Sequence, residues 1–243
     1  MSDRLTSGHT LQRYDQALAA LNALVLEAGA KARDNLHQAL AALERNDAEL
    51  ARKVIGEDQA INDLDRQVEE KVFQIIALQQ PVAKDLRDLL AVDHMMLDIE
   101  RIGDESRRLA RIVLYYHERG QAPDPAIVAQ IATLVHWVDA MVEAALRAFK
   151  DDDAALALEV LRRDAGLDNE MKAALRQLCD LPLDPDHKLE QVVEITLALR
   201  AVERIGRHAA HIARHVIFLI TGQDVRHKPL EAAEAAVRAH TGA

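Results

Sequence analysis

Apolar residues recur at three- and four-residue spacing along most of the chain. In the first stretch the apolar positions are Leu18, Leu21, Val25, Ala28, Ala32, Leu36, Ala39 and Leu43, and in the next they are Val54, Ile61, Val68, Val72 and Ile75. This spacing gathers apolar side chains on one face of an α-helix, which is the face that a helix in a bundle buries. The pattern therefore predicts long amphipathic helices that pack side by side.

Short polar and proline-containing segments divide this pattern. They are Asn46-Asp47, Gln79-Gln80-Pro81, Gly120–Pro125, Asp151–Asp153 and Leu181–Asp186. Asn and Asp cap helix N-termini, and the residue before a proline avoids the helical conformation, so these segments mark helix ends. We expect six helices, over residues 9–45, 48–79, 82–119, 125–150, 153–180 and 187–221. The tail after Gly222 is expected to be less ordered, although Leu230–Ala239 could add a helical turn or two.

The composition favours an all-α fold. Aromatic residues make up only 3% of the chain, and there are few helix breakers, with 9 Gly and 6 Pro. The abundant Ala, Leu, Arg and Glu lose little side-chain entropy in a helix. With 49% hydrophobic residues, the chain has enough apolar surface to bury a core.

The two halves of the chain resemble each other. A shift of 106 residues (47 to 153) carries Asp47, Leu50, Val54, Asp58 and Ile61 onto Asp153, Leu156, Val160, Asp164 and Leu167. A shift of 103 residues (100 to 203) carries Glu100-Arg101-Ile102-Gly103 onto the identical Glu203-Arg204-Ile205-Gly206. We interpret this as a tandem duplication of a three-helix unit. Short loops make neighbouring helices antiparallel, which predicts two three-helix bundles, over 9–119 and 125–221, followed by the tail 222–243.

Carboxylates interrupt the apolar face of helices in both halves. Asp58 and Glu100 do so in the first half, and Asp164 and Glu203 do so in the second. A buried carboxylate without a partner costs several kcal/mol, so such acids need a cation, a proton or a position at the edge of the bundle.

A second oxygen ligand follows one helical turn after three of these acids. The pairs are Asp58 with Asn62, Glu100 with Asp104, and Asp164 with Asp168, whereas Glu203 is followed by Arg207. Residues four apart share a helix face, and clustered oxygen ligands suit hard or borderline divalent metals. The alternatives are that the acids face water, or that Arg207 neutralises Glu203. A di-iron enzyme of the ferritin type needs Glu-x-x-His pairs, and neither Glu100 nor Glu203 has one.

Other candidate chemistry is sparse. Three histidines lie on one predicted helix, and of these His211 and His215 could clamp a metal, although solvated or helix-capping roles are favoured. The net charge of -10 argues against nucleic-acid or anionic-lipid binding. The single Cys179 excludes an internal disulfide, and the N-terminus has no apolar signal core, so we expect a cytoplasmic protein without a membrane span.

Four segments carry a resemblance to a known family. They are Leu78–Arg87 (LQQPVAKDLR), Glu100–Asp104 (ERIGD), Glu203–Gly206 (ERIG) and Gly222–His227 (GQDVRH). In these segments and in their order, the sequence resembles the PhoU family of phosphate-specific transport accessory proteins. The resemblance implies two similar three-helix bundles and a regulator rather than an enzyme.

The resemblance also implies partners and ligands. Family members are negative regulators of the phosphate starvation response, thought to link the nucleotide-binding subunit of the phosphate ABC transporter to a sensor histidine kinase. Some members carry iron or zinc clusters on paired E(D)xxxD motifs, which fall here on Asp58–Asn62, Glu100–Asp104, Asp164–Asp168 and Glu203–Arg207. Iron, zinc and manganese are thus the candidate ions, and a homodimer is expected.

Overall fold

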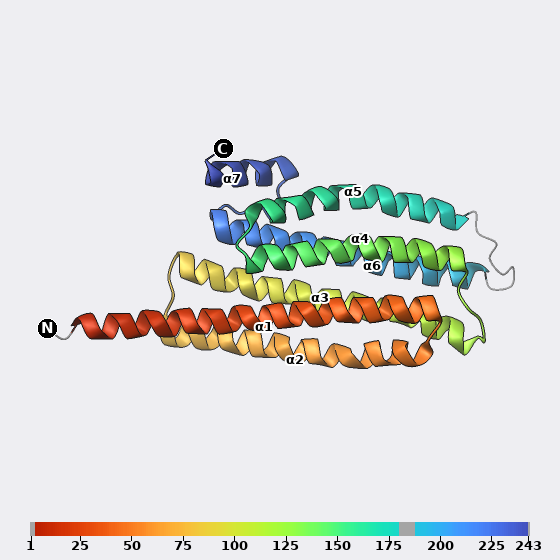
Figure 1. Ribbon diagram of the computed structural model, residues 1–243, viewed down its shortest axis with the longest axis horizontal. Coiled ribbons are helices and arrows are strands. Elements are labelled where there is room, and N and C mark those ends of the chain that lie inside the picture. The colour runs from red at the N-terminus through yellow and green to blue at the C-terminus, as the bar shows by residue number, and fades with distance from the viewer. Residues whose placement is uncertain (1–2, 180–187, 243) are drawn as a thin grey trace.

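The chain is helical throughout the part that the structure, a computed structural model, describes, namely residues 3–179 and 188–242. Within these ranges it forms seven α-helices and no strand (Figure 1). The helices are α1 Asp3–Arg45, α2 Ala48–Gln79, α3 Lys84–Glu118, α4 Pro125–Lys150, α5 Ala154–Cys179, α6 Lys188–Thr221 and α7 Leu230–Thr241. The all-α prediction is confirmed, and the break predicted at Leu181–Asp186 lies outside the described residues.

Acidic caps start equivalent helices in the two halves. The Asp47 carboxylate accepts hydrogen bonds from the backbone N–H groups of Glu49 and Leu50 at the start of α2. Its repeat equivalent, Asp153, accepts one from the N–H of Leu156 at the start of α5. These carboxylates satisfy N–H groups that the first helical turn leaves unpaired, which fixes both boundaries.

The helices pack as two layers of three. Helices α1, α2 and α3 contact one another, as do α4, α5 and α6, and α7 lies on α5 and α6 (Figure 1). The layers join through α3 against α6 and α1 against α4. Helices α3 and α6 are antiparallel: Arg119 reaches Glu190 at one end of the seam, and Arg87 lies over the Phe218 ring at the other.

The predicted apolar faces form the core. Leu21, Val25 and Leu36 of α1 are fully buried, as are Val54 and Ile61 of α2. They belong to one cluster of buried side chains that extends through both repeats. The spacing of apolar residues therefore identified the buried faces correctly.

Small residues allow close helix contact at two junctions. A Cβ atom at Gly206 of α6 would lie 2.5 Å from Cδ2 of Leu167 and 3.1 Å from Cγ1 of Val138. At Gly29 of α1, a Cβ atom would lie 2.6 Å from Cδ2 of Leu146 in α4. Gly206 thus seats α6 against its own bundle, and Gly29 seats α1 against the other repeat.

The tail differs from the sequence expectation. Its C-terminal part is ordered as α7, and Ala233, Ala236 and Val237 are buried. Arg162 of α5 also pairs with Glu234, at 2.9 Å between Nη2 and Oε1. The expectation of lower order is wrong for these residues because the three small apolar side chains share one face, and the alternative of a helix near Leu230–Ala239 is confirmed.

Helix α4 is the only described helix long and apolar enough to cross a membrane by length and composition. Its apolar residues Ile131, Val135, Val138 and Val142 are buried against neighbouring helices. Because the core helix of a bundle passes the same test, this finding is weak evidence for a membrane span.

Candidate functional site

Arg207 gathers the acids predicted in the second half. Its Nη1 lies 3.5 Å from Oδ1 of Asp164, and its Nη2 contacts Oδ1 of Asp168 and lies 4.0 Å from Oε1 of Glu203. The structure thus brings Asp164 and Asp168 of α5 together with Glu203 of α6, as predicted. It also shows that Arg207 serves all three carboxylates, whereas the sequence suggested a pairing with Glu203 alone.

Asp164 is the buried member of this group, with only 6% of its surface exposed. Burial raises the pKa of its carboxyl group, while Arg207 and then Arg214 oppose that shift. A buried carboxylate is stable only beside compensating charge. Arg207 supplies the positive charge that a metal ion would otherwise supply.

In the first half, Glu100 and Asp104 each lie beside an arginine of their own helix, α3. Arg101 Nε lies 3.4 Å from Oε2 of Glu100, and Arg107 Nη2 lies 2.7 Å from Oδ1 of Asp104. Less than a fifth of either acidic side chain is exposed. Asn62 is half-buried on α2, whereas the side chain of Asp58 lies outside the described residues. Metal binding by the seven predicted ligands stays a prediction.

Asp65 is a further half-buried acid on α2, with Asp93 of α3 among its charged neighbours. It was not singled out from the sequence. Burial raises the pKa of its carboxyl group, and the negative charges of Glu69 and of Asp93 on α3 raise it further. Asp65 follows Asp58 by seven residues, which is about two helical turns along α2. This spacing is the sequence signal that could have identified it.

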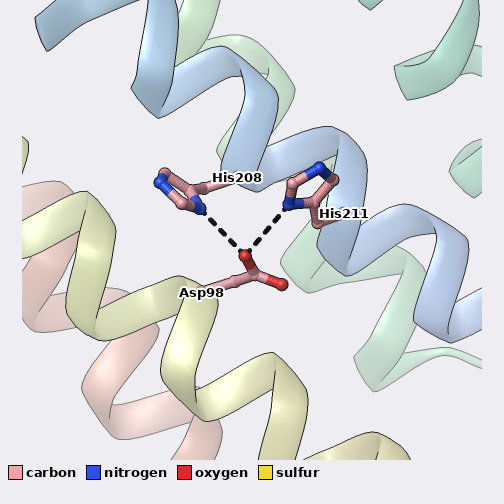
Figure 2. Close-up of side chains that lie close together, drawn as sticks. All are labelled: Asp98, His208 and His211. Atoms are coloured by element: carbon pink, nitrogen blue, oxygen red, sulfur yellow. Dashed lines mark hydrogen bonds and ion pairs between the residues drawn. The ribbon is translucent and has the colours of Figure 1, made fainter. Parts of the chain in front are cut away.

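A second group of ligand-bearing side chains lies at the seam between the repeats. Asp98 comes from α3, and His208 and His211 come from α6 (Figure 2). Oδ1 of Asp98 lies 2.9 Å from Nδ1 of His208 and 3.2 Å from Nδ1 of His211, as the dashed lines in Figure 2 mark. One donor atom from each residue lies within 4.8 Å of the others, so the three could hold a metal ion.

Electrostatics keep Asp98 ionised. Burial acts to raise the pKa of this carboxyl group, but the hydrogen bonds from His208 and His211 outweigh it, and the pKa is lowered. His215, one turn further along α6, is only 6% exposed, and burial lowers its pKa to about 4. Its Nε2 lies 3.9 Å from Oδ2 of Asp98, and its ring centroid is 5.6 Å from that of His94.

These contacts correct the sequence-based expectation that the histidines of α6 are solvated or cap the helix. Solvated or capping roles are wrong for His208 and His215, because both side chains are largely buried at the α3–α6 seam. The pair that shares a ligand-bearing neighbour is His208 with His211, rather than His211 with His215. Asp98 was missed because only the register between α3 and α6 brings it to the histidines.

Two similar trios of helices, with acids at matching places in each, define a tandem-repeat all-α protein. The sequence model of the PhoU domain matches twice, over residues 25–113 and 131–216. These two matches cover most of the chain, one in each trio. The chain belongs to the PhoU family.

Relatives agree over nearly the whole length. The chain is 35% identical to a phosphate-specific transport system accessory protein PhoU homolog of Pseudomonas putida, over 95% of this chain and 89% of that protein. It is 36% identical to the homolog of Pseudomonas aeruginosa, over 93% of this chain and 92% of the relative.

Two solved structures share the fold. The crystal structure of PhoU from Pseudomonas aeruginosa matches with a TM-score of 0.80 at 35% identity, over 86% of this chain and all of the other. The phosphate transport system regulatory protein PhoU from Streptococcus pneumoniae matches with a TM-score of 0.77 at 25% identity, over 87% of this chain and 99% of the other. The PhoU family consists of regulatory accessory proteins and is not a family of enzymes.

Proposed function

We propose that the protein is a cytoplasmic negative regulator of phosphate uptake and of the phosphate starvation response. In this proposal it works as an adaptor between two partners, the nucleotide-binding subunit of the phosphate ABC transporter and the sensor histidine kinase. The observation that carries the proposal is the full-length similarity to phosphate-specific transport accessory proteins. We further propose the two bundles, over 9–119 and 125–221, as its domains, with the tail 222–243 packed on the second.

An exposed apolar row on α6 supports a role in protein contacts. Leu189, Val193 and Leu197 are spaced four residues apart and are 77%, 48% and 57% exposed. Side chains at this spacing line one face of a helix. A row of exposed apolar side chains rimmed by polar residues is typical of protein-binding surfaces.

A groove beside this row carries basic side chains, although the chain as a whole is acidic. It has a volume of about 370 Å³ and lies between α3 and α6, where Leu197 lines it, and its charged lining residues are four arginines and two glutamates, namely Arg108, Arg111, Arg200, Arg204, Glu105 and Glu194. Arg108 and Arg204 both pair with Glu105, so the excess of positive charge comes from the arginines outnumbering the glutamates. Complementary charge steers and orients partners. The combination suits a partner segment with apolar and acidic side chains.

Binding and expression measurements test the adaptor proposal. The purified protein is expected to bind the cognate transporter subunit, the cytoplasmic part of the cognate kinase, or both, in a pull-down with an unrelated ATPase subunit as the control. Deletion of the gene should raise phosphate-starvation gene expression in high phosphate. Failure to bind both partners, together with unchanged expression, would contradict the proposal. Sedimentation of the purified protein tests the expected homodimer.

Metal binding by the duplicated carboxylates is a second candidate function. It is favoured by the low exposure of Glu100 and Asp104 in the first half, whereas in the second half Arg207 holds the place among Asp164, Asp168 and Glu203 that an ion would take. Iron, zinc and manganese are the candidate ions, because carboxylate oxygens bind hard and borderline cations. Asp58 and Asn62 would complete the first set.

Replacing the arginine of the second half gives a direct test. Arg207→Asp removes the compensating cation and puts a second acid one turn after Glu203. This variant should bind Mn²⁺ more tightly than the unaltered protein and unfold at a higher temperature when Mn²⁺ is added. Arg147→Asp makes the same charge change at an exposed position on α4, outside the predicted pairs. Equal Mn²⁺ binding by all three proteins would dispose of a carboxylate site in the second half.

A further inference from the structure

Two imidazoles and one carboxylate converge where the two repeats meet. Each nitrogen–oxygen distance is that of a hydrogen bond, 2.9 Å for His208 and 3.2 Å for His211, and both bonds end on the same oxygen of Asp98. Donor atoms around a tetrahedral Zn²⁺ are about 3.3 Å apart, given metal–ligand distances of about 2.0–2.1 Å. Both nitrogen–oxygen distances are therefore close to the spacing of ligands around one ion, and all three donor atoms lie within 4.8 Å of one another.

The surroundings favour a cation between these groups. The side chains of Asp98 and His208 are 14% and 19% exposed, so this carboxylate is mostly withdrawn from water. A divalent ion would take the place of the two Nδ1 protons, with each imidazole then carrying its proton on Nε2 and giving its Nδ1 lone pair to the ion, and it would compensate the buried negative charge.

His215 lies one turn further along α6, beside the second oxygen of the Asp98 carboxylate. The residue is 6% exposed, and its Nδ1 is buried without a hydrogen-bond partner among the described residues. Its other nitrogen faces the second carboxylate oxygen of Asp98 at 3.9 Å, too far for a hydrogen bond. A small rotation of the carboxylate toward an ion would bring Oδ2 within reach of His215, which would then orient the ligand as an outer partner.

We propose that Asp98, His208 and His211 bind a borderline divalent cation, with Zn²⁺ as the type case, which cross-links α3 of the first repeat to α6 of the second. Two imidazoles and one carboxylate suit zinc and its transition-metal neighbours better than Mg²⁺ or Ca²⁺, which prefer all-oxygen ligands. The site shares no residue with the duplicated carboxylate pairs. The proposed site does not depend on the proposed role in phosphate regulation, because its chemistry involves these three side chains alone.

The consequence is a clamp between the two halves. Because α3 and α6 form the main seam between the layers, an ion held from both sides fixes their register. A ligand that binds the folded chain and not the unfolded chain stabilises it by mass action. Metal supply would thus set the rigidity of the whole molecule rather than that of one bundle.

Titration of the chelator-stripped full-length protein with Zn²⁺ tests the site. The double variant His208→Gln/His211→Gln is expected to bind one Zn²⁺ per chain fewer than the unaltered protein. At a Zn²⁺ concentration 100 times the Kd, the unaltered protein should unfold about 5–10 °C higher than without Zn²⁺, and the double variant should lose that shift. His136→Gln, an exposed histidine on α4, is the matched control and should keep both effects.

Cobalt gives a readout that does not depend on stability. Co²⁺ in place of Zn²⁺ should give the visible absorption of a nitrogen-ligated, low-coordinate ion, and His211→Gln alone should abolish it. His211 is half exposed, so this single variant should fold normally. Equal zinc stoichiometry in the unaltered protein and the double variant would overturn the proposal, as would a cobalt spectrum unchanged by His211→Gln. Zinc that remains bound to the double variant belongs to other sites.

Discussion

Arg207 of α6 lies against the buried Asp164 of α5, with Nη1 3.5 Å from Oδ1. The same guanidinium reaches Asp168 and Glu203, so one cation serves three carboxylates from two helices. In the second repeat, the negative charge of the buried Asp164 is thus compensated by the Arg207 side chain. In the first repeat, Arg107 pairs with Asp104 one turn earlier on the same helix.

Removing this cation should destabilise the fold. Arg207→Gln leaves Asp164 buried without its main countercharge, and we expect a loss of about 1–3 kcal/mol in the free energy of unfolding. Urea denaturation at neutral pH measures it. Arg200→Gln is the control, since Arg200 pairs with Glu203 at the exposed surface and should cost less than about 1 kcal/mol. Equal, small losses in both variants would show that Arg207 does not hold Asp164.

The fold followed from the sequence because helix-forming information here is local. Apolar spacing marked the buried faces, and short polar segments marked the helix boundaries, where the structure shows the side chains of Asp47, Asp124 and Asp153 accepting hydrogen bonds from backbone N–H groups. The duplication was visible because equivalent positions carry the same chemistry. Helix α7 was harder to predict, since it buries mainly small alanine side chains, whose apolar signal is weak.

The candidate site was only partly predictable because its contacts cross between helices. Spacing along one helix can pair Glu203 with Arg207, but it cannot show that Arg207 also reaches Asp168 on another helix. Asp98 meets His208 only through the antiparallel register of α3 and α6. That register depends on how the two repeats pack, which no pattern within one helix reveals.

A pH dependence is expected from the ion pair that joins α1 to α4. Arg33 donates to both oxygens of Asp139, at 2.9 Å and 3.0 Å, and His37 Nε2 lies 3.0 Å from Oδ2. Burial acts to raise the pKa of Asp139, but these hydrogen bonds outweigh it and the pKa is lowered. A carboxyl group with a lowered pKa in the folded state stabilises the fold above its ordinary pKa near 3.8, and this contribution is lost as the pH falls through the folded value.

Asp139→Asn should therefore destabilise the protein by about 1–3 kcal/mol at neutral pH, and the difference should shrink below the ordinary pKa and vanish once the pH is below the lowered folded-state pKa. Urea denaturation across the pH range measures it. Glu143→Gln serves as the control, because its pairing with Arg33 is at the exposed surface and should change stability little. A difference for Asp139→Asn that persists unchanged into strong acid would mean that packing, and not the charge, is responsible.

Two glycines in helices should respond to alanine in opposite ways. At Gly206 an added Cβ meets Leu167 at 2.5 Å, so Gly206→Ala should cost about 1–3 kcal/mol through overpacking. At Gly56 in α2 nothing lies within 4 Å, so Gly56→Ala should stabilise by about 0.5–1 kcal/mol through helix propensity. Thermal and urea unfolding of both variants check the pair. Stabilisation by Gly206→Ala would refute the close approach of α6 to α5.

The exposed row on α6 should matter for partners and not for folding. Val193→Asp and Leu197→Asp each put a charge on a half-exposed apolar position, so stability should change by less than about 0.5 kcal/mol. If the row contacts a partner, each variant should weaken the interaction at least tenfold, because a desolvated carboxylate in an apolar contact costs more than about 1.4 kcal/mol. Binding is measured to the transporter subunit and to the kinase domain, each immobilised on a sensor surface. Sedimentation of the same variants measures whether they form the expected dimer.

Leu78→Asp supplies the matched control for that measurement. Leu78 is 77% exposed near the C-terminal end of α2, away from the α3–α6 seam, so the variant adds the same charge elsewhere. Partner binding lost only in the two α6 variants would assign the contact to this row. Dimer dissociation with partner binding intact would instead assign the row to a second copy of the chain, because a self-association surface fails without disturbing contacts made elsewhere. If neither property changed, the row would have no part in assembly.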